Sequence, residues 1–271
     1  MNWLHKLIPA VVLFCIWMVA GFVSGKVCAF LLVSQSTWPT QSKFALMMGT
    51  WVLFMYLGVW LSSKKLKALD GLWAVLTNFP VKATITWTVI GIVIPALAIL
   101  ISLPLEEQSF RDLDLTLSIL GQHQVGLQAR IAAAFYEEFT DRGMTLFVLL
   151  GIFARAKHRI LISIMLASVL FAFGHSTRDP GMLLRIMVFG CLTGAICLRY
   201  QSIFPGVGMH AMANATLNVF NGNDVTGGIL LGLGEKHLIF DIFLLAGLFC
   251  FMGKNLLANR HCRNPEFSAV H

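Results

Sequence analysis

Eight apolar segments account for most of the 271-residue chain, and this pattern constrains its fold more than any other feature. They cover residues 7–33, 44–61, 83–103, 126–153, 159–175, 182–199, 202–221 and 238–257. A bilayer has a hydrocarbon core of about 30 Å, which a helix of about 20 apolar residues can cross. Lipid offers no hydrogen bonds to the backbone, and the chain lacks the alternating pattern of a barrel. The sequence therefore predicts an all-α, polytopic membrane helix bundle of about eight transmembrane helices.

The composition excludes other classes of protein. Only 12% of the residues are charged and 57% are hydrophobic, whereas a soluble domain carries about 25% charged residues. The net charge of +7 comes from basic residues scattered between apolar segments, so no nucleic-acid partner is expected. The six cysteines form no CxxC pair, which favours small core residues over a disulfide framework or a zinc knuckle.

The charges between the segments predict the orientation in the membrane. With the N-terminus in the cytoplasm, two strongly basic loops lie inside, one with Lys64, Lys65, Lys67 and Lys82 and the next with Arg155, Lys157 and Arg159. The acidic interval 104–125 then lies outside, as an amphipathic surface helix or a solvated loop. Both termini are expected in the cytoplasm, and residues 1–271 form one membrane domain. The short loops favour a multi-pass protein of a bacterial inner membrane.

The fourth segment concentrates charge where charge is costly. It contains Glu137, Glu138, Asp141 and Arg142 between apolar flanks, and a charge inside a span costs about 2.5–3.5 kcal/mol on insertion scales. Glu138 and Arg142 are i,i+4 neighbours in the favourable order and can form an ion pair. Glu137 lies about 100° around the helix and is free to act as a general base or acid. The alternative is a purely structural ionic cluster, or a position in an outer loop.

Two later segments add polar side chains. The fifth ends with Phe171 and His175, and the seventh carries His210 and Asn214 on one helical face. A single histidine in a span is most often a hydrogen-bonding contact between helices. An acid, an imidazole and two hydrogen-bond donors on three helices are, however, the components of a site for peptide hydrolysis. The motifs of zinc, aspartyl and serine intramembrane proteases (HExxH, GxGD and GxSxG) are absent from the sequence.

The polar residues of the fourth, fifth and seventh segments form three motifs whose order, each on a separate apolar segment, resembles the CPBP family. The shared pattern is Glu-Glu-x-x-x-Arg at residues 137–142, Phe-x-x-x-His at 171–175 and His-x-x-x-Asn at 210–214. The family is named for CAAX proteases and bacteriocin-processing enzymes, and is also called the Abi family of glutamic-type intramembrane endopeptidases. The resemblance covers residues 126–221, which we expect to be the catalytic core.

The resemblance implies a role for each motif residue. Glu137 would activate a water molecule with help from His175, while His210 and Asn214 would stabilise the oxyanion; Glu138, Arg142 and Phe171 would support them. The expected partners are a membrane-associated peptide or protein substrate and the lipid bilayer. No cofactor is expected, although Glu137, His175 and His210 are chemically competent ligands for Zn²⁺. The other alternative is a non-catalytic membrane protein with an immunity or transport role.

Overall fold

The computed structural model describes residues 40–63, 70–102, 130–175, 179–221 and 245–247, with single positions at 12, 19, 23 and 27. These residues form helices and turns, and there is no strand among them. The all-α prediction is confirmed for this part of the chain. The interval 104–125 and nearly all of the predicted first and eighth segments lie outside the described residues.

The helices follow the apolar segments closely. They are α2 (Thr40–Ser63), α3 (Asp70–Thr77), α4 (Val81–Ser102), α7 (Arg159–Phe173), α8 (Pro180–Tyr200) and α9 (Phe204–Asn221). Between α4 and α7, residues 130–137 are helical and continue without a break into η4 (Glu138–Thr145) and α6 (Leu146–Ile152). The short helix α3 was not predicted, because it lies in the interval assigned to a basic loop.

Two helices of the described part are long and apolar enough to cross a membrane. They are α4, over Val81–Ala98, and α8, over Pro180–Tyr200. The apolar stretches Leu46–Leu61 and Arg159–Phe173 are shorter. The count of eight spans and the orientation of the termini stay predictions.

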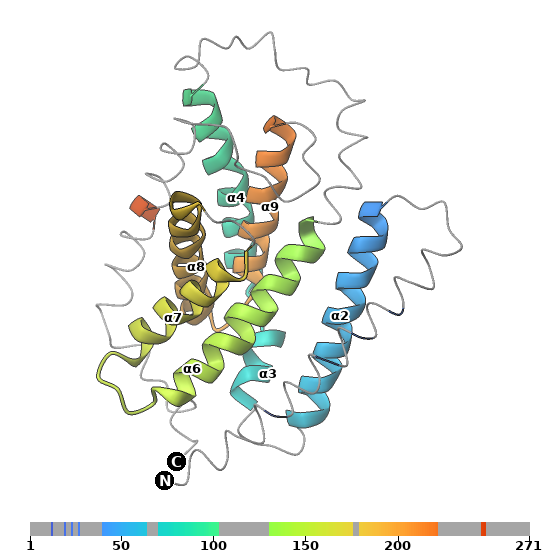
Figure 1. Cartoon of the computed structure of the whole chain (residues 1–271), viewed down its shortest axis with the longest axis vertical. Helices are drawn as coiled ribbons and strands as arrows, with labels where there is room; N and C mark the ends of the chain where they lie inside the picture. Colours follow the sequence, from blue (N-terminus) through green and yellow to red (C-terminus); the bar gives the residue numbers. More distant parts are fainter. Residues whose placement is uncertain are drawn as a thin grey trace.

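The helices pack so that η4 lies at the centre of the described bundle. The η4 segment contacts α3, α6, α7 and α8, while α4 lies along α9 and α7 lies along α8. Figure 1 shows residues 130–152 as one helix crossing the middle of the molecule, with α7 and α8 on one side of it and α2 on the other. The charged residues of the fourth segment are therefore surrounded by other helices.

The turn between α8 and α9 is fixed by hydrogen bonds to Asn78, in the turn between α3 and α4. Ser202 donates from its hydroxyl to the Asn78 carbonyl over 2.5 Å, and the Asn78 amide donates to the Tyr200 carbonyl over 3.0 Å. Gln201 ends α8 with a positive φ of 48°, the left-handed conformation that commonly closes a helix. These contacts fix the position at which α9, and with it His210, begins.

Glycine permits the close approach of α4 and α9. A Cβ atom placed on Gly91 of α4 would clash with the Met209 carbonyl oxygen and lie 2.9 Å from the Met209 Cα. Both are backbone atoms, which cannot move aside as a flexible side chain can. The α4–α9 contact therefore depends on glycine at position 91, which has no Cβ atom.

We predict that Gly91→Ala destabilises the protein by about 1–3 kcal/mol, the usual cost of overpacking. Gly49→Ala is the matched control, because a Cβ at Gly49 of α2 meets nothing within 4 Å. There the gain in helix propensity should stabilise the fold by about 0.5–1 kcal/mol. The free energy of unfolding can be measured by SDS titration in mixed micelles. A Gly91→Ala protein as stable as the wild type would contradict the packing described here.

Candidate active site

The site is built on a π-helical turn. From Glu138 to Thr145 the backbone hydrogen bonds run from residue i to residue i+5, and the Leu146 N–H accordingly donates to the Asp141 carbonyl. The Thr140 hydroxyl donates to the Tyr136 carbonyl over 2.8 Å, and the Thr145 hydroxyl donates to the Thr140 carbonyl over 3.0 Å. Threonine hydroxyls thus bond carbonyls along the widened turn. Single π-helical turns inside α-helices are frequent at functional sites.

A buried ion pair lies on this turn. Arg142 Nε is 3.4 Å from Glu138 Oε2, and the two side chains are 2% and 0% exposed. Arg142 Nε also donates to the Thr193 hydroxyl of α8 over 2.8 Å. The guanidinium carbon lies 3.8 Å above the ring of Phe171 on α7, a cation–π geometry. The η4 segment is therefore tied to both α7 and α8 through Arg142.

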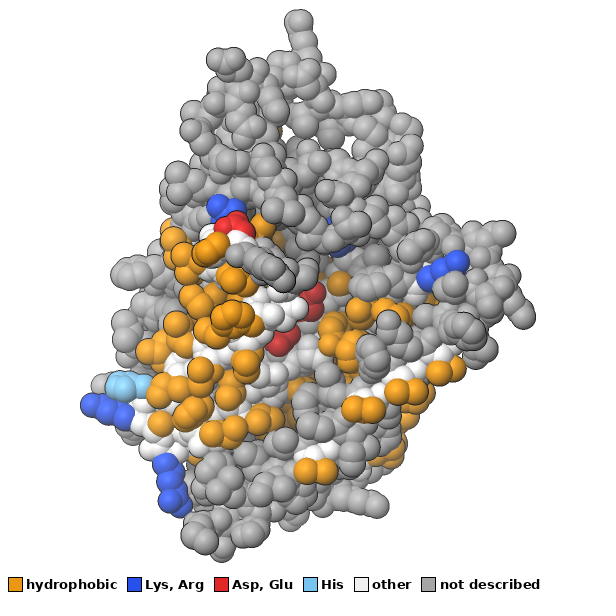
Figure 2. All heavy atoms as spheres, in the orientation of Figure 1, with side chains coloured by type: hydrophobic (Ala, Val, Ile, Leu, Met, Phe, Trp, Pro, Cys, Tyr) orange, Lys and Arg blue, Asp and Glu red, His pale blue; other side chains and the backbone are white. Residues whose placement is uncertain are grey.

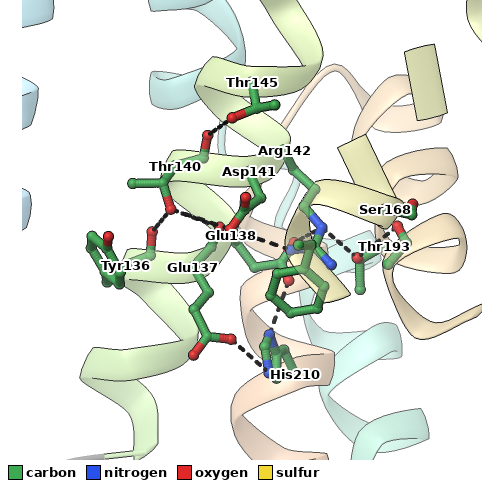
Figure 3. A network of polar contacts seen from close by, with 12 residues as sticks. Tyr136, Glu137, Glu138, Thr140, Asp141, Arg142, Thr145, Ser168, Thr193 and His210 are labelled. Atoms are coloured by element: carbon green, nitrogen blue, oxygen red, sulfur yellow. Dashed lines mark hydrogen bonds and ion pairs between the residues drawn. The ribbon is translucent and has the colours of Figure 1, made fainter. Parts of the chain in front are cut away.

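His210 lies between the two glutamates. Its Nδ1 is 3.0 Å from Glu138 Oε1 and its Nε2 is 3.5 Å from Glu137 Oε2. The ring is buried, with Phe189 in edge contact at a centroid distance of 4.8 Å. Figure 3 shows the Glu137 side chain extending toward His210 while Glu138 lies toward Arg142. The His210 ring thus contacts both glutamates, on one side Glu138, which is paired with Arg142, and on the other side Glu137.

The two glutamates differ sharply in exposure. The Glu137 side chain is 27% exposed, whereas the Glu138 side chain is fully buried. Asp141 is 22% exposed. Figure 2 shows acidic side chains near the middle of a face whose other described side chains are largely hydrophobic. A substrate can therefore approach Glu137 but not Glu138.

The other predicted residues lie around this centre at different distances. His175, at the end of α7, is half-buried, and its Nδ1 is 2.9 Å from the Phe171 carbonyl oxygen. The Phe171 ring contacts both histidines, with centroid distances of 4.7 Å to His175 and 6.3 Å to His210. Asn214 is half-buried, one turn after His210 on α9. Within the described part of the chain, Glu137 makes its ion pair with His210 and makes none with His175.

Several residues at the site were not predicted from the sequence. Thr193 accepts a hydrogen bond from Arg142, Phe189 packs on His210, and Gly206 lies so close to Glu138 that a Cβ would be 3.0 Å from Oε2. A usable signal was present in α8, where Gly190 and Gly194 form a GxxxG pattern, typical of close helix packing in membranes. Added Cβ atoms there would meet Ser168 and Ile164 of α7.

The geometry of the site also bears on metal binding. Among the described residues, no group of three or more His, Cys, Asp or Glu side chains is arranged to hold a metal ion. Glu137 and His210 are close to each other, while His175 contacts the Phe171 carbonyl.

The comparison with protein families places the site in a known domain. Residues 122–216 match the model of the Rce1-like family, described as type II CAAX prenyl endopeptidase Rce1-like. This segment is an Rce1-like domain of the CPBP family, so the resemblance carried by the motifs is confirmed. The matched residues include Glu137, Glu138, Arg142, His175 and the His210–Asn214 pair. Comparison with curated proteins and with solved structures gives no match.

We predict that Arg142→Met lowers the free energy of unfolding by about 3–5 kcal/mol, because it leaves the buried Glu138 carboxylate without its cation. The double variant Glu138→Gln/Arg142→Met should recover part of this loss, since it removes the uncompensated charge. Arg155→Met, at an exposed arginine, is the control for loss of an arginine. SDS titration in mixed micelles measures all four proteins, wild type included. A double variant less stable than Arg142→Met alone would show that the pair is not the source of the loss.

Proposed function

We propose that the protein is a glutamic-type intramembrane endopeptidase that hydrolyses peptide bonds of membrane-associated substrates. The observation that carries the proposal is the unequal pair of neighbouring acids inside an Rce1-like domain. Glu138 is buried on Arg142, whereas Glu137 is partly exposed and 3.5 Å from a buried imidazole. An accessible carboxylate held by a fixed scaffold is what a general base requires.

The surface of the helices supports a multi-pass protein of the cell membrane. On α4 the exposed side chains include Val81, Ile85, Val89, Ile92, Val93, Leu97, Leu100 and Ile101, and Lys82 is exposed in its first turn. On α7 the exposed set includes Leu161, Met165, Leu166, Leu170 and Phe173. A soluble protein rarely exposes contiguous apolar faces of this kind. Lipid chains are the natural partner for them, which agrees with the membrane spans predicted at α4 and α8.

In the proposed mechanism Glu137 acts first as a base. Its carboxylate accepts a proton from a water molecule as the water oxygen bonds to the scissile carbonyl carbon. The carbonyl oxygen becomes an anion, for which the His210 ring and the Asn214 amide are the proposed donors. When the tetrahedral intermediate collapses, the C–N bond breaks and the proton held by Glu137 passes to the leaving amine. The products are a carboxylic acid and an amine, and no other reactant is consumed.

The geometry of His210 adds a condition to this scheme. Its Nδ1 faces the Glu138 carboxylate, which has no proton to give when ionised, so Nδ1 carries a hydrogen and donates. Nε2 then faces Glu137 and the space above it. It donates to an oxyanion only when the ring is protonated on both nitrogens, and otherwise accepts a hydrogen bond. The proposed oxyanion role of His210 therefore requires the imidazolium form.

The proposed role of His175 is indirect. Its ring and the Arg142 guanidinium both contact the Phe171 ring, and His175 makes no ion pair with Glu137 among the described residues. We therefore assign water activation to Glu137, with His175 as a helper that orients the water.

We predict that Glu137→Gln abolishes cleavage, because an amide cannot accept the proton of water. Asp141→Asn is the matched control: it removes a carboxylate of similar exposure on the same turn and should leave cleavage within about ten-fold of the wild type. The assay uses purified protein in proteoliposomes with a panel of membrane-anchored precursor peptides and prenylated CAAX peptides. Each reaction is run with and without a chelator.

The outcomes separate the proposed function from its alternatives. Chelator-resistant cleavage that is lost in Glu137→Gln supports the glutamate mechanism. Chelator-sensitive cleavage would assign the reaction to a metal-dependent version of the site. A folded Glu137→Gln protein that cleaves as the wild type does would contradict the proposal. A non-catalytic immunity or transport role would tolerate this substitution.

We also predict that Asn214→Ala lowers kcat by about 10²–10³, the usual cost of removing one oxyanion donor. The KM should stay nearly constant, because the lost hydrogen bond forms only as negative charge develops on the carbonyl oxygen. Steady-state kinetics on any cleaved peptide of the panel measures both quantities. A rise in KM at unchanged kcat would instead place Asn214 in substrate binding.

A further inference from the structure

Thr193 of α8 lies in the site, although it belongs to none of the motifs in the sequence. Its side chain is fully buried, and its hydroxyl lies 3.2 Å from the carbonyls of both Phe189 and Gly190 on the preceding turn. A hydroxyl has one hydrogen and two lone pairs. Since the hydrogen is donated to the helix backbone, a lone pair is left to accept from Arg142 Nε over 2.8 Å.

This bond is the principal constraint on the guanidinium. Among the described residues, the NH1 and NH2 groups of Arg142 are buried and make no hydrogen bond. NH1 comes only within 3.9 Å of Asp141 Oδ2. The Phe171 ring, 3.8 Å from the guanidinium carbon, offers a cation–π contact but no hydrogen-bond acceptor in a fixed direction. The Thr193 hydroxyl accepts the single hydrogen of Nε and so holds this nitrogen in place, 3.4 Å from Glu138 Oε2.

The position of the Arg142 guanidinium also affects the position of the His210 ring. Glu138 Oε2 is 3.4 Å from Arg142 Nε, and Oε1 of the same carboxylate is 3.0 Å from His210 Nδ1. Gly206 of α9 leaves just enough space for this carboxylate, because a Cβ there would be 3.0 Å from Oε2 and 3.8 Å from the Thr193 Cβ. A rotation of the guanidinium would therefore move the carboxylate and change the bond that holds Nδ1.

We propose that Thr193 is a positioning residue of the site, which acts through Arg142 and Glu138 to hold His210 with its Nδ1–H on Glu138 and its Nε2 toward Glu137. The importance of this position for catalysis rests on the proposed function. The positioning itself does not, because it is a property of the protein without substrate. Its test can therefore be made on the free protein.

The test measures by nuclear magnetic resonance which ring nitrogens of His210 carry hydrogen. Protein labelled with ¹⁵N in its histidine rings is prepared in detergent at pH 7, and the His210 signals are identified by their loss in His210→Gln. In the wild type they should show hydrogen on Nδ1. Thr193→Val keeps the shape of the side chain but removes the acceptor, so the His210 signals should shift away from this pattern. Thr193→Ser keeps the hydroxyl and should restore them.

The controls separate positioning from general damage. Thr86→Val removes an exposed hydroxyl of α4 that donates to the Lys82 carbonyl of its own helix, and should leave the His210 signals unchanged. The signals of the other histidines report whether each variant is folded. If Thr193→Val does not fold, Thr193→Ala removes the same acceptor without adding bulk. His210 signals identical to the wild type in a folded Thr193 variant without the hydroxyl would overturn the proposal.

Kinetics provides the second readout. On a cleaved peptide, Thr193→Val should lower kcat by about ten- to a hundred-fold at nearly constant KM, the scale expected when a remote change misplaces a reacting group. Thr193→Ser should recover most of the rate. Cleavage that survives in Glu137→Gln would refute the proposed function but leave the resonance result valid. A wild-type rate in Thr193→Val, with Glu137→Gln inactive, would refute the positioning role alone.

Discussion

The buried ion pair between Glu138 and Arg142 is the interaction on which the site depends. Both side chains are removed from solvent, so either one alone would be an uncompensated charge in a low-dielectric interior. Together they fix the π-helical turn of η4 against α7, through Phe171, and against α8, through Thr193. The second oxygen of the Glu138 carboxylate, Oε1, then contacts His210 of α9. One pair of charges thus sets the relative positions of the helices that carry the candidate catalytic groups.

The pair also explains how two adjacent acids can have different functions. Glu138 is neutralised and buried, while Glu137, the preceding residue, is partly exposed beside His210. The difference comes from the environment, since the side chains are chemically identical. A membrane interior makes the difference larger, because an ionised group without a partner is most costly there. The mechanism we propose uses this asymmetry, with a buried scaffold carboxylate and an accessible one.

Much of the fold could be predicted from the sequence. An apolar segment long enough to cross a bilayer must satisfy its backbone hydrogen bonds internally, and a helix does so. The bounds of α2, α4, α7, α8 and α9 agree with the segments to within a few residues. The i,i+4 spacing also indicated the Glu138–Arg142 contact. The π-helical turn was not predictable, because helical periodicity assumes 3.6 residues per turn. The contact between His210 and the glutamates was equally hidden, since it depends on how α9 packs against η4 and not on any spacing along the chain.

The central claim is that Glu137 is the reactive acid and Glu138 the scaffold. The most direct test is to treat the wild-type protein in detergent with dicyclohexylcarbodiimide, a reagent that labels carboxyl groups in apolar surroundings, and to locate the label by mass spectrometry. Our account predicts that Glu137 is labelled more than Glu138, because only Glu137 is accessible, and that the label at position 137 is lost in Glu137→Gln. Labelling of Glu138 equal to or greater than that of Glu137 would contradict it.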